Sequence, residues 1–303
     1  MYLETFRLPV HIEQELLEKR AEHNGGRNGY VDNPYPCHLF SEKGLSEIGF
    51  KKITIFYGGN GSGKSTLLNL IAEKLSLNRV SPYNSGEMFC SYVENCQYTL
   101  GYDDEGFPHR VPNGSRIITS DDIFDYMLTV RTNNSEISES KEQAREKWQD
   151  LKFGETVRLG GLEDYEALRL QMLSRKKSVT RRQFIRRTAG EEVKLNSNGE
   201  TALRYFEQKL KSDTLYCLDE PENSLSPKMQ LELVKMLEEM ARYCGCQFVI
   251  ATHSPFLLAL QGAKIYDLDS TPVEVKEWWE LENVKIYFDF FERNRHHFVS
   301  AET

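Results

Sequence analysis

Residues 58–65 read Gly-Gly-Asn-Gly-Ser-Gly-Lys-Ser, which matches the phosphate-loop pattern G-x-x-x-x-G-K-[ST]. An apolar, β-branched run precedes the loop at 53–57, and apolar residues at helical spacing follow it between 67 and 75. The loop is therefore expected to join a buried strand to a helix N-terminus, where backbone N–H groups and the helix dipole favour an anion. Lys64 can then reach the outer phosphates of a nucleotide, and the Ser65 hydroxyl can bind Mg²⁺. The residues expected to contact a nucleoside triphosphate are Gly58, Asn60, Gly61, Ser62, Gly63, Lys64, Ser65 and Thr66.

The composition limits the other classes of protein to consider. The chain has 303 residues and 39% hydrophobic content, enough for one large domain or two small ones. Its net charge is −8, so the chain as a whole is not a nucleic-acid wrapper. The six cysteines lack the spacing of a zinc site, and we interpret them as reduced thiols. We find no signal peptide and no apolar run of the ~18 residues that span a bilayer, and we expect a cytoplasmic protein with no membrane contact.

Strand and helix patterns divide the chain into a core and an insertion. Strand signals are present at 2–10 and, broken by turn-rich segments, from 88 to 119, where we expect hairpin strands. At Ser120 a helix N-cap and an acidic first turn begin a charged helical pattern, and strand signals return only at Thr214. We therefore predict an α/β fold, with N-terminal antiparallel β elements and a core sheet, mixed or parallel, flanked by helices. Residues 1–119 and 201–303 would form this core, and residues 120–200 a helical lobe.

Two further buried strands end in polar residues. The apolar run at 214–218 is followed by Asp219 and Glu220, and the run at 247–251 is followed by a segment that contains His253. The carboxyl ends of parallel strands are where such sheets bind ligands. Asp219 can hold Mg²⁺ beside Ser65, and Glu220 can orient or deprotonate a water molecule. A strand-end turn and a bystander histidine are the structural alternatives, which the phosphate loop in the same chain disfavours.

The segment 196–200, Asn-Ser-Asn-Gly-Glu, has two interpretations. Ser197 and Glu200 form an S-x-x-E capping box, which alone explains them structurally. A capped helix start with a glycine at 199 is also an anion site. Both interpretations place a helix N-terminus at this point of the chain.

Together these motifs resemble the ATP-binding-cassette (ABC) class of ATPases, and more narrowly the soluble ATPases grouped with SMC, RecF-type and overcoming-lysogenization-defect proteins. The resemblance spans about residues 39–268. Leu218-Asp219-Glu220-Pro221 resembles the Walker B motif with its catalytic glutamate, and 251–254 the switch-histidine motif. The segment 196–200 resembles the signature motif, with Ser197 and Gly199 at its key positions. Residues 223–225 resemble the D-loop, although Ser226 stands where transporters usually have Asp.

Two elements of the ABC pattern are less well defined. Gln97 is one candidate for the Q-loop, and Ser120-Asp121-Asp122 is the better one, because it lies where a strand leads into the helical lobe. Asp121 would then replace the glutamine that helps to hold the metal. Tyr35 lies at a plausible upstream distance for an adenine-stacking aromatic, and a core or loop tyrosine is the alternative.

The resemblance implies a mechanism. Two copies would sandwich two ATP molecules with Mg²⁺, each phosphate loop facing the signature helix of the other copy, so that hydrolysis loosens the dimer. The helical lobe would transmit this switch to a protein partner such as an effector or nuclease, or to nucleic acid, in phage defence or DNA maintenance. The nucleotide-binding subunit of a transporter and a RecF-like DNA-binding clamp are the alternatives.

A basic stretch stands out in this acidic chain. Residues 175–187 carry seven basic residues and no acidic one. A solvated helix face is the usual meaning of such a run, and contact with a nucleic acid or an acidic partner is the alternative.

Overall fold

The computed structural model describes residues 1–24, 34–83, 85–103, 105–153, 155, 164–176, 179–189 and 198–299. The chain divides into two compact units, Met1–Ile123 with Ala202–Thr303, and Phe124–Thr201. The strands are β1 Leu3–Arg7, β2 Glu47–Gly49, β3 Ile53–Tyr57, β4 Gln97–Leu100, β5 Arg116–Thr119, β6 Leu215–Asp219, β7 Gln247–Ala251, β8 Lys264–Asp267 and β9 Glu274–Lys276. The helices of the first unit include α1 His11–Asn24, α2 Lys64–Lys74, α3 Glu87–Asn95, α8 Pro227–Tyr243, α9 Pro255–Leu258, α10 Glu282–Arg293 and α11 Arg295–Val299, with a 3-10 turn, η2, at Trp278–Glu280.

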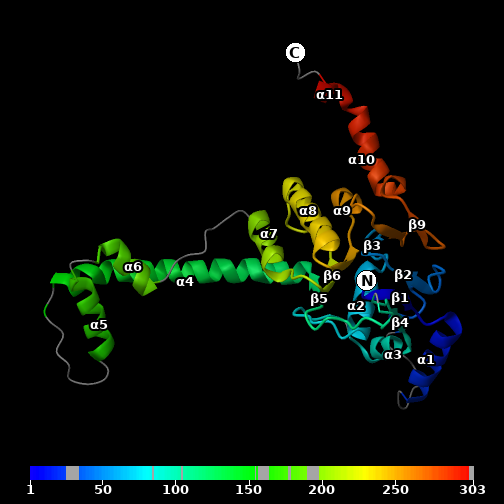
Figure 1. The fold of residues 1–303 in the computed structure, drawn as a ribbon, viewed down its shortest axis with the longest axis horizontal. Helices are drawn as coiled ribbons and strands as arrows, with labels where there is room; N and C mark the ends of the chain where they lie inside the picture. Colours follow the sequence, from blue (N-terminus) through cyan, green and yellow to red (C-terminus); the bar gives the residue numbers. More distant parts are fainter. Residues whose placement is uncertain are drawn as a thin grey trace. The chain divides into compact units, whose positions relative to one another are not determined.

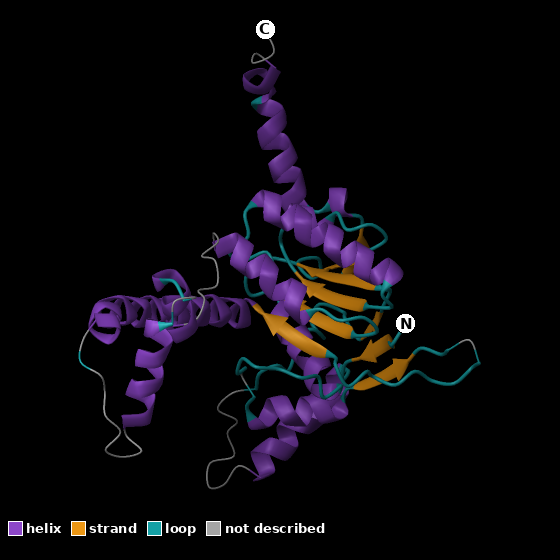
Figure 2. Cartoon of the chain, turned by 60° about the vertical axis from the view of Figure 1, so that its left-hand side comes forward, coloured by secondary structure: helices purple, strands orange, loops and turns teal. Residues whose placement is uncertain are grey.

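A six-stranded sheet forms the centre of the first unit (Figures 1 and 2). Its strand order is β5-β6-β7-β3-β8-β9; the first five strands are parallel, and β9 is antiparallel to β8. Every residue of β3 and β7 is buried, which explains why these strands are continuous apolar runs rather than alternating ones. Helices lie on both sides of this sheet (Figure 2). This arrangement confirms the predicted α/β fold with a predominantly parallel sheet.

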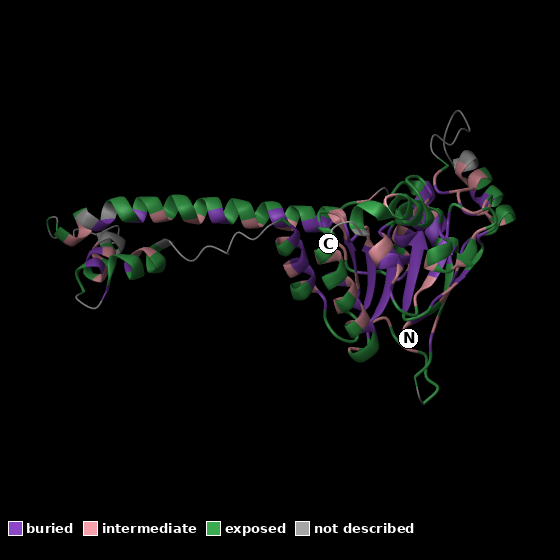
Figure 3. Cartoon of the chain, turned by 90° about the horizontal axis from the view of Figure 1, so that it is seen from above, coloured by how far each residue is buried: buried purple, intermediate pink, exposed green. Residues whose placement is uncertain are grey.

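Apolar helix faces complete the core. Leu67, Leu68 and Ile71 of α2 belong to one buried cluster with Cys217 of β6 and Val249 of β7. The purple strands of Figure 3 show how completely the sheet is covered. The core therefore fixes the carboxyl ends of β3, β6 and β7 side by side, which is where the predicted site residues follow.

A smaller sheet lies at the N-terminus, in the order β2-β1-β4, with both strand pairs antiparallel. It confirms the expected N-terminal antiparallel elements. Gln247 is the first residue of β7 and is 1% exposed. Its side chain connects β7 to the small sheet. Its Oε1 accepts hydrogen bonds from the backbone N–H groups of Tyr2 and Leu3, both at 2.9 Å, and its Nε2 donates to the Leu3 carbonyl at 2.8 Å.

The prediction of hairpin strands from 88 to 119 was partly wrong. Residues 87–95 form α3, and only β4 and β5 are strands in this segment. The buried residues of α3 are Met88, Phe89, Tyr92 and Val93, which share one face at helical spacing against the core cluster. A nine-residue helix gives too little periodicity for this face to stand out in the sequence.

The second unit contains most of α4 (Ser120–Phe153), together with α5 (Asp164–Arg175) and α6 (Arg181–Ala189). A small core of Ala144, Trp148, Val179 and Phe184 holds these helices together, with the Trp148 and Phe184 rings 4.9 Å apart. The helix α7 (Asn198–Lys209) begins in this unit and continues into the first. Within the described residues, no helix combines the length and the apolar character that a membrane span needs.

Candidate nucleotide site

The phosphate loop leaves the carboxyl end of β3 and enters α2, as the motif predicts. Gly63 precedes the helix with φ 101°, a backbone conformation that side chains disfavour. A Cβ atom on Gly63 would also lie 3.0 Å from the ring of Phe40. Lys64 is 5% exposed, and its Nζ donates to the carbonyl oxygens of Gly58 at 2.7 Å and Gly59 at 3.0 Å. The loop is thus wrapped around the lysine that would meet the phosphates.

An acidic pair follows β6 and faces this loop. The Ser65 Oγ donates to the Asp219 Oδ1 at 3.0 Å. Burial raises the pKa of Asp219 to about 6, and the Ser65 hydrogen bond opposes this rise. A hydroxyl and a carboxylate are hard oxygen ligands of the kind that Mg²⁺ prefers, so this pair fits a Mg²⁺ ion. Among the described residues, no three His, Cys, Asp or Glu side chains cluster closely enough to hold a metal by themselves. A metal at this site would therefore need other ligands besides Asp219, and the Ser65 hydroxyl is one.

Glu220 lies between the phosphate-loop lysine and the histidine that follows β7. Its Oε1 is 3.8 Å from the Lys64 Nζ and 3.7 Å from the His253 Nδ1. Its backbone has φ 47°, and its N–H donates to the Ala251 carbonyl at 2.9 Å. Asn223 holds the other carboxylate oxygen through a 3.1 Å hydrogen bond from its Nδ2. The Glu220 side chain is therefore held in one orientation and is partly exposed, as a residue that activates a water molecule must be.

Glu222 is a site residue that the sequence reasoning missed. It is 5% exposed, and its Oε1 accepts hydrogen bonds from the Thr252 hydroxyl at 2.6 Å and from the N–H groups of His253 and Ser254 at 3.1 and 3.2 Å. The same oxygen is 3.6 Å from the His253 Nδ1. Glu222 therefore fixes the turn that presents His253 to Glu220. Only its position two residues after Glu220 could have drawn attention to it.

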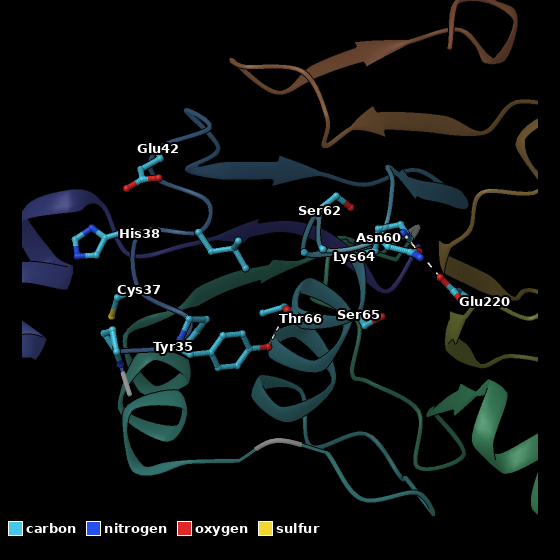
Figure 4. A pocket seen from close by; sticks show the side chains of 15 residues that line it. Tyr35, Cys37, His38, Glu42, Asn60, Ser62, Lys64, Ser65, Thr66 and Glu220 are labelled. Carbon is cyan, nitrogen blue, oxygen red and sulfur yellow. Dashed lines mark hydrogen bonds and ion pairs between the residues drawn. The ribbon is translucent and has the colours of Figure 1, made fainter. Parts of the chain in front are cut away.

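A cleft of about 750 Å³ opens beside the phosphate loop (Figure 4). One wall is the loop from 60 to 66 with Glu220, and the other is the segment 34–39 with Glu42. The Tyr35 hydroxyl donates to the Thr66 Oγ1 at 2.7 Å and so connects the two walls. The side chain of Gln14, which is fully buried, holds the second wall by accepting from the His38 N–H at 2.6 Å and donating to the Pro9 carbonyl at 2.6 Å.

Asp121 and Gln97 are the two residues considered for the Q-loop. Asp121 is exposed in the first turn of α4, whereas its neighbour Asp122 is buried and accepts hydrogen bonds from the Ser81 N–H and the Thr119 N–H at 3.0 and 2.8 Å. Gln97 is in the small sheet, where it accepts from the Arg7 side chain at 3.3 Å. Asp122 thus holds the first turn of α4 against Ser81, and the expected roles of Asp121 and Gln97 stay predictions.

The signature segment is described only in part. Asn196 and Ser197 lie outside the described residues. Gly199 is buried in the first turn of α7 and belongs to the second unit. The expected roles of Ser197 and Gly199 therefore stay predictions.

A phosphate loop at the carboxyl edge of a parallel sheet, faced by acidic residues from the next strands, defines the class of P-loop nucleotide-binding proteins. Within this class, the family described as "ABC transporter" matches residues 47–223, more than half of the chain, and the chain belongs to that family. Its members hydrolyse ATP, and the protein is an ATPase. A second family, described as "AAA domain, putative AbiEii toxin, Type IV TA system", matches residues 201–259.

Individual proteins of the same kind are similar to the chain. The petrobactin import ATP-binding protein YclP of Bacillus subtilis (strain 168) is 25% identical over 266 residues, 84% of this chain and 90% of that protein. The ATP-binding cassette MJ0796, in a post-hydrolysis dimer bound to ADP and Pi, is 16% identical with a TM-score of 0.36 over 77% of this chain and 88% of that one. The SMC head domain from Thermotoga maritima is 15% identical with a TM-score of 0.36 over 91% of this chain and 99% of that one.

Proposed function

We propose that this protein is a cytoplasmic ATPase that binds ATP with Mg²⁺ in the cleft and hydrolyses it between two copies of the chain. The observation that carries this proposal is the convergence of Lys64, Ser65, Asp219, Glu220 and His253 at the ends of three adjacent strands.

Each side chain has a separate task in hydrolysis. Lys64 and the loop N–H groups bind the outer phosphates, which places the reacting phosphorus at the mouth of the cleft. Ser65 and Asp219 would hold Mg²⁺, which supplies charge neutralisation at the phosphate oxygens. Glu220 takes a proton from the attacking water, and His253 orients Glu220 and contacts the terminal phosphate.

The exposure of two site residues supports the proposal that a second copy of the chain covers the cleft. Glu220 has a side chain that is 26% exposed, and His253 one that is 47% exposed. Efficient phosphoryl transfer needs water excluded around the reacting groups, and one copy alone leaves these two side chains in contact with solvent. We propose that Ser197 and Gly199 of a second copy close the site, as the resemblance to the signature motif implies, and that ATP thereby joins the two copies.

The first experiment combines phosphate release with light scattering after size-exclusion chromatography. Glu220→Gln should abolish turnover and leave an ATP-dependent dimer, because the variant binds ATP without activating water. Lys64→Ala should lose both nucleotide binding and the ATP-dependent dimer. The matched control is Glu232→Gln, which changes an exposed glutamate in α8 and should behave as wild type. Unchanged phosphate release by Glu220→Gln would refute the catalytic assignment.

We expect a partner of the proposed ATPase to contact the helix α6, which carries a basic surface. Arg181, Arg182, Arg186 and Arg187 are exposed on this nine-residue helix, while Phe184 anchors it in the second unit. We propose that this surface contacts nucleic acid or an acidic protein, in phage defence or DNA maintenance. The match of 201–259 to a toxin–antitoxin family supports a defence setting. Nucleic-acid binding should weaken linearly in log–log plots as salt rises, and Arg181→Gln/Arg182→Gln should reduce the slope by roughly two.

A transporter subunit is the second candidate, favoured by the similarity to the petrobactin import protein over most of both chains. Co-purification with a membrane-embedded partner would favour this candidate over the switch. ATP-dependent DNA binding by the isolated protein would favour the third candidate, a RecF-like clamp.

A further inference from the structure

Tyr35 is held at both ends of its side chain. Its half-buried ring packs against the core cluster and lies nearly parallel to the Phe89 ring, with 6.2 Å between the ring centroids and 16° between the ring planes. Its hydroxyl donates to the Thr66 Oγ1 at 2.7 Å (Figure 4). One face of the Tyr35 ring is therefore turned toward Phe89, while its hydroxyl lies at the first turn of α2.

The first turn of α2 is the part of the cleft where a helix leaves N–H groups unpaired. The helix begins at Lys64, and the Leu67 N–H donates to the Gly63 carbonyl at 2.9 Å. The N–H groups that precede Leu67 have no acceptor one turn earlier in the helix, so this turn can bind an anion. Thr66 is buried in the same turn and lines the cleft. A donor on the Thr66 side chain would add to these N–H groups.

The hydrogen bond from Tyr35 decides what the Thr66 hydroxyl can do. A threonine hydroxyl has one proton to donate and two lone pairs that accept. Because the Thr66 Oγ1 accepts from Tyr35, its own proton stays available, and the described residues contain no acceptor bonded to it. Hydrogen bonds in a chain polarise one another, so a hydroxyl that accepts a bond becomes a stronger donor. Thr66 is thus prepared to donate to a ligand in the cleft.

Figure 4 shows how the cleft side chains are ordered. Glu220 and Lys64 lie at one end, with 3.8 Å between the carboxylate and the ammonium group, and His38 lies at the other end. The pair of Tyr35 and Thr66 lies between these ends. With the terminal phosphate beside Lys64 and Glu220, the phosphate that carries the ribose comes nearest to Thr66.

We propose that Tyr35 positions the Thr66 hydroxyl to donate to the phosphate nearest the ribose, and that Tyr35 serves the phosphate chain rather than stacking on the base. The inference rests on the proposed function, because it takes the cleft as the ATP site. Tyr35 is a positioning residue in this arrangement, since it acts through Thr66. Its contribution should therefore be the same for any ligand that carries the three phosphates.

The test compares the affinities of ATP and inorganic tripolyphosphate, both with Mg²⁺, by calorimetry. Tyr35→Phe removes the hydroxyl and keeps the ring, and it should raise the Kd of both ligands by roughly fivefold, the effect of one neutral hydrogen bond. Stacking on the base predicts instead that Tyr35→Phe binds both ligands as wild type and that Tyr35→Leu loses affinity for ATP alone. Either of these two results would overturn the proposal.

Thr66 variants separate a phosphate donor from a strut between the two cleft walls. Thr66→Val should raise both Kd values by roughly thirtyfold, because a hydrogen bond to a charged group contributes more than a neutral one. Adding Tyr35→Phe to Thr66→Val should change nothing further, and Thr66→Ser should keep near wild-type affinity. Equal losses for Tyr35→Phe and Thr66→Val would indicate a strut and overturn the proposed donation.

Tyr83→Phe is the matched control. The Tyr83 ring also packs on Phe89, with 5.5 Å between centroids, but its hydroxyl donates to the Glu73 Oε2 at 2.6 Å, away from the cleft lining. This variant should bind both ligands as wild type, and a loss equal to that of Tyr35→Phe would assign the effect to packing. ATP binding that survives Lys64→Ala would overturn the proposed function together with this inference. A loss with Lys64→Ala and none with Tyr35→Phe would overturn this inference alone.

Discussion

Glu222 offers the sharpest test of how the site is held together. Its Oε1 accepts three hydrogen bonds, from a hydroxyl and two N–H groups of 252–254, and the Thr252 and Ser254 side of this turn is buried. Glu222→Ala leaves these donors without their common acceptor. A buried donor that loses its partner costs about 1 to 3 kcal/mol.

The expected loss follows from these contacts. The Ser254 N–H keeps a second acceptor, the Thr252 Oγ1 at 3.0 Å, so its loss is partial. Removing a buried carboxylate also recovers part of its desolvation cost. We therefore expect Glu222→Ala to lower the free energy of unfolding by about 2 to 4 kcal/mol, which corresponds to a fall in Tm of roughly 5 to 15 °C for a unit of this size.

Glu222→Gln separates the hydrogen bonds from the charge. The amide oxygen can replace Oε1, and the amide nitrogen would take the place of Oε2, which has no hydrogen-bond partner among the described residues. We expect its stability to fall by less than that of Glu222→Ala, because the unpaired amide N–H groups cost about 1 to 3 kcal/mol and removal of the buried charge recovers part of this. Its ATPase rate should nevertheless fall, because a negative charge 3.6 Å from the His253 Nδ1 is lost.

Urea unfolding and phosphate release of both variants provide the assay. Glu222→Ala should lose stability and activity together, and Glu222→Gln should lose mainly activity. A Glu222→Ala protein as stable as wild type would refute the reasoning, because the turn at His253 would then not depend on the buried carboxylate.

Three further predictions concern other parts of the same site. Burial raises the pKa of Asp219 to about 6 from an ordinary value of 3.8, so the folded state binds an extra proton between these two pH values. The free energy of unfolding of the nucleotide-free protein should therefore fall as the pH rises from about 4 to about 6. Asp219→Asn should remove this pH dependence in urea titrations. Gly63→Ala should cost about 1 to 3 kcal/mol and weaken ATP binding, seen by calorimetry, because φ 101° and the nearby Phe40 ring both oppose a side chain; unchanged affinity would count against the loop geometry. Asn283→Ala removes the hydrogen bond to the His253 carbonyl and should lower kcat more than it weakens ATP affinity, and equal changes in both would show that Asn283 acts on binding instead.

The central sheet and the phosphate loop could be predicted because their signals are local. A glycine-rich loop between an apolar run and a helical pattern specifies its own backbone, and strands buried on both faces read as unbroken apolar runs. The convergence of Asp219, Glu220 and His253 followed from one rule, since neighbouring parallel strands end at the same edge of a sheet.

Other features depend on contacts between distant segments. Glu222 looks like any acidic residue until the structure shows it buried under the turn that begins at Thr252, thirty positions later. Of the two neighbouring aspartates at the start of α4, the sequence did not indicate that Asp122 turns inward to Ser81. The short helix α3 needed its packing partners to be recognised, and the exposure of the aromatic residues on α10 is invisible in a sequence that simply reads as apolar.

Two of the buried glutamine side chains, Gln14 and Gln247, hold together segments of the first unit near the cleft before any ligand arrives. Gln247, the first residue of β7, joins this strand to β1 through the backbone of Tyr2 and Leu3. Gln14 of α1 holds the segment 34–39 through the His38 N–H. The Tyr35 hydroxyl, which donates to the Thr66 Oγ1, then connects this segment to the phosphate loop across the cleft. A nucleotide entering this cleft meets a shape that already exists, so little ordering entropy opposes its binding, and more of the interaction energy remains to draw a second copy onto the open side.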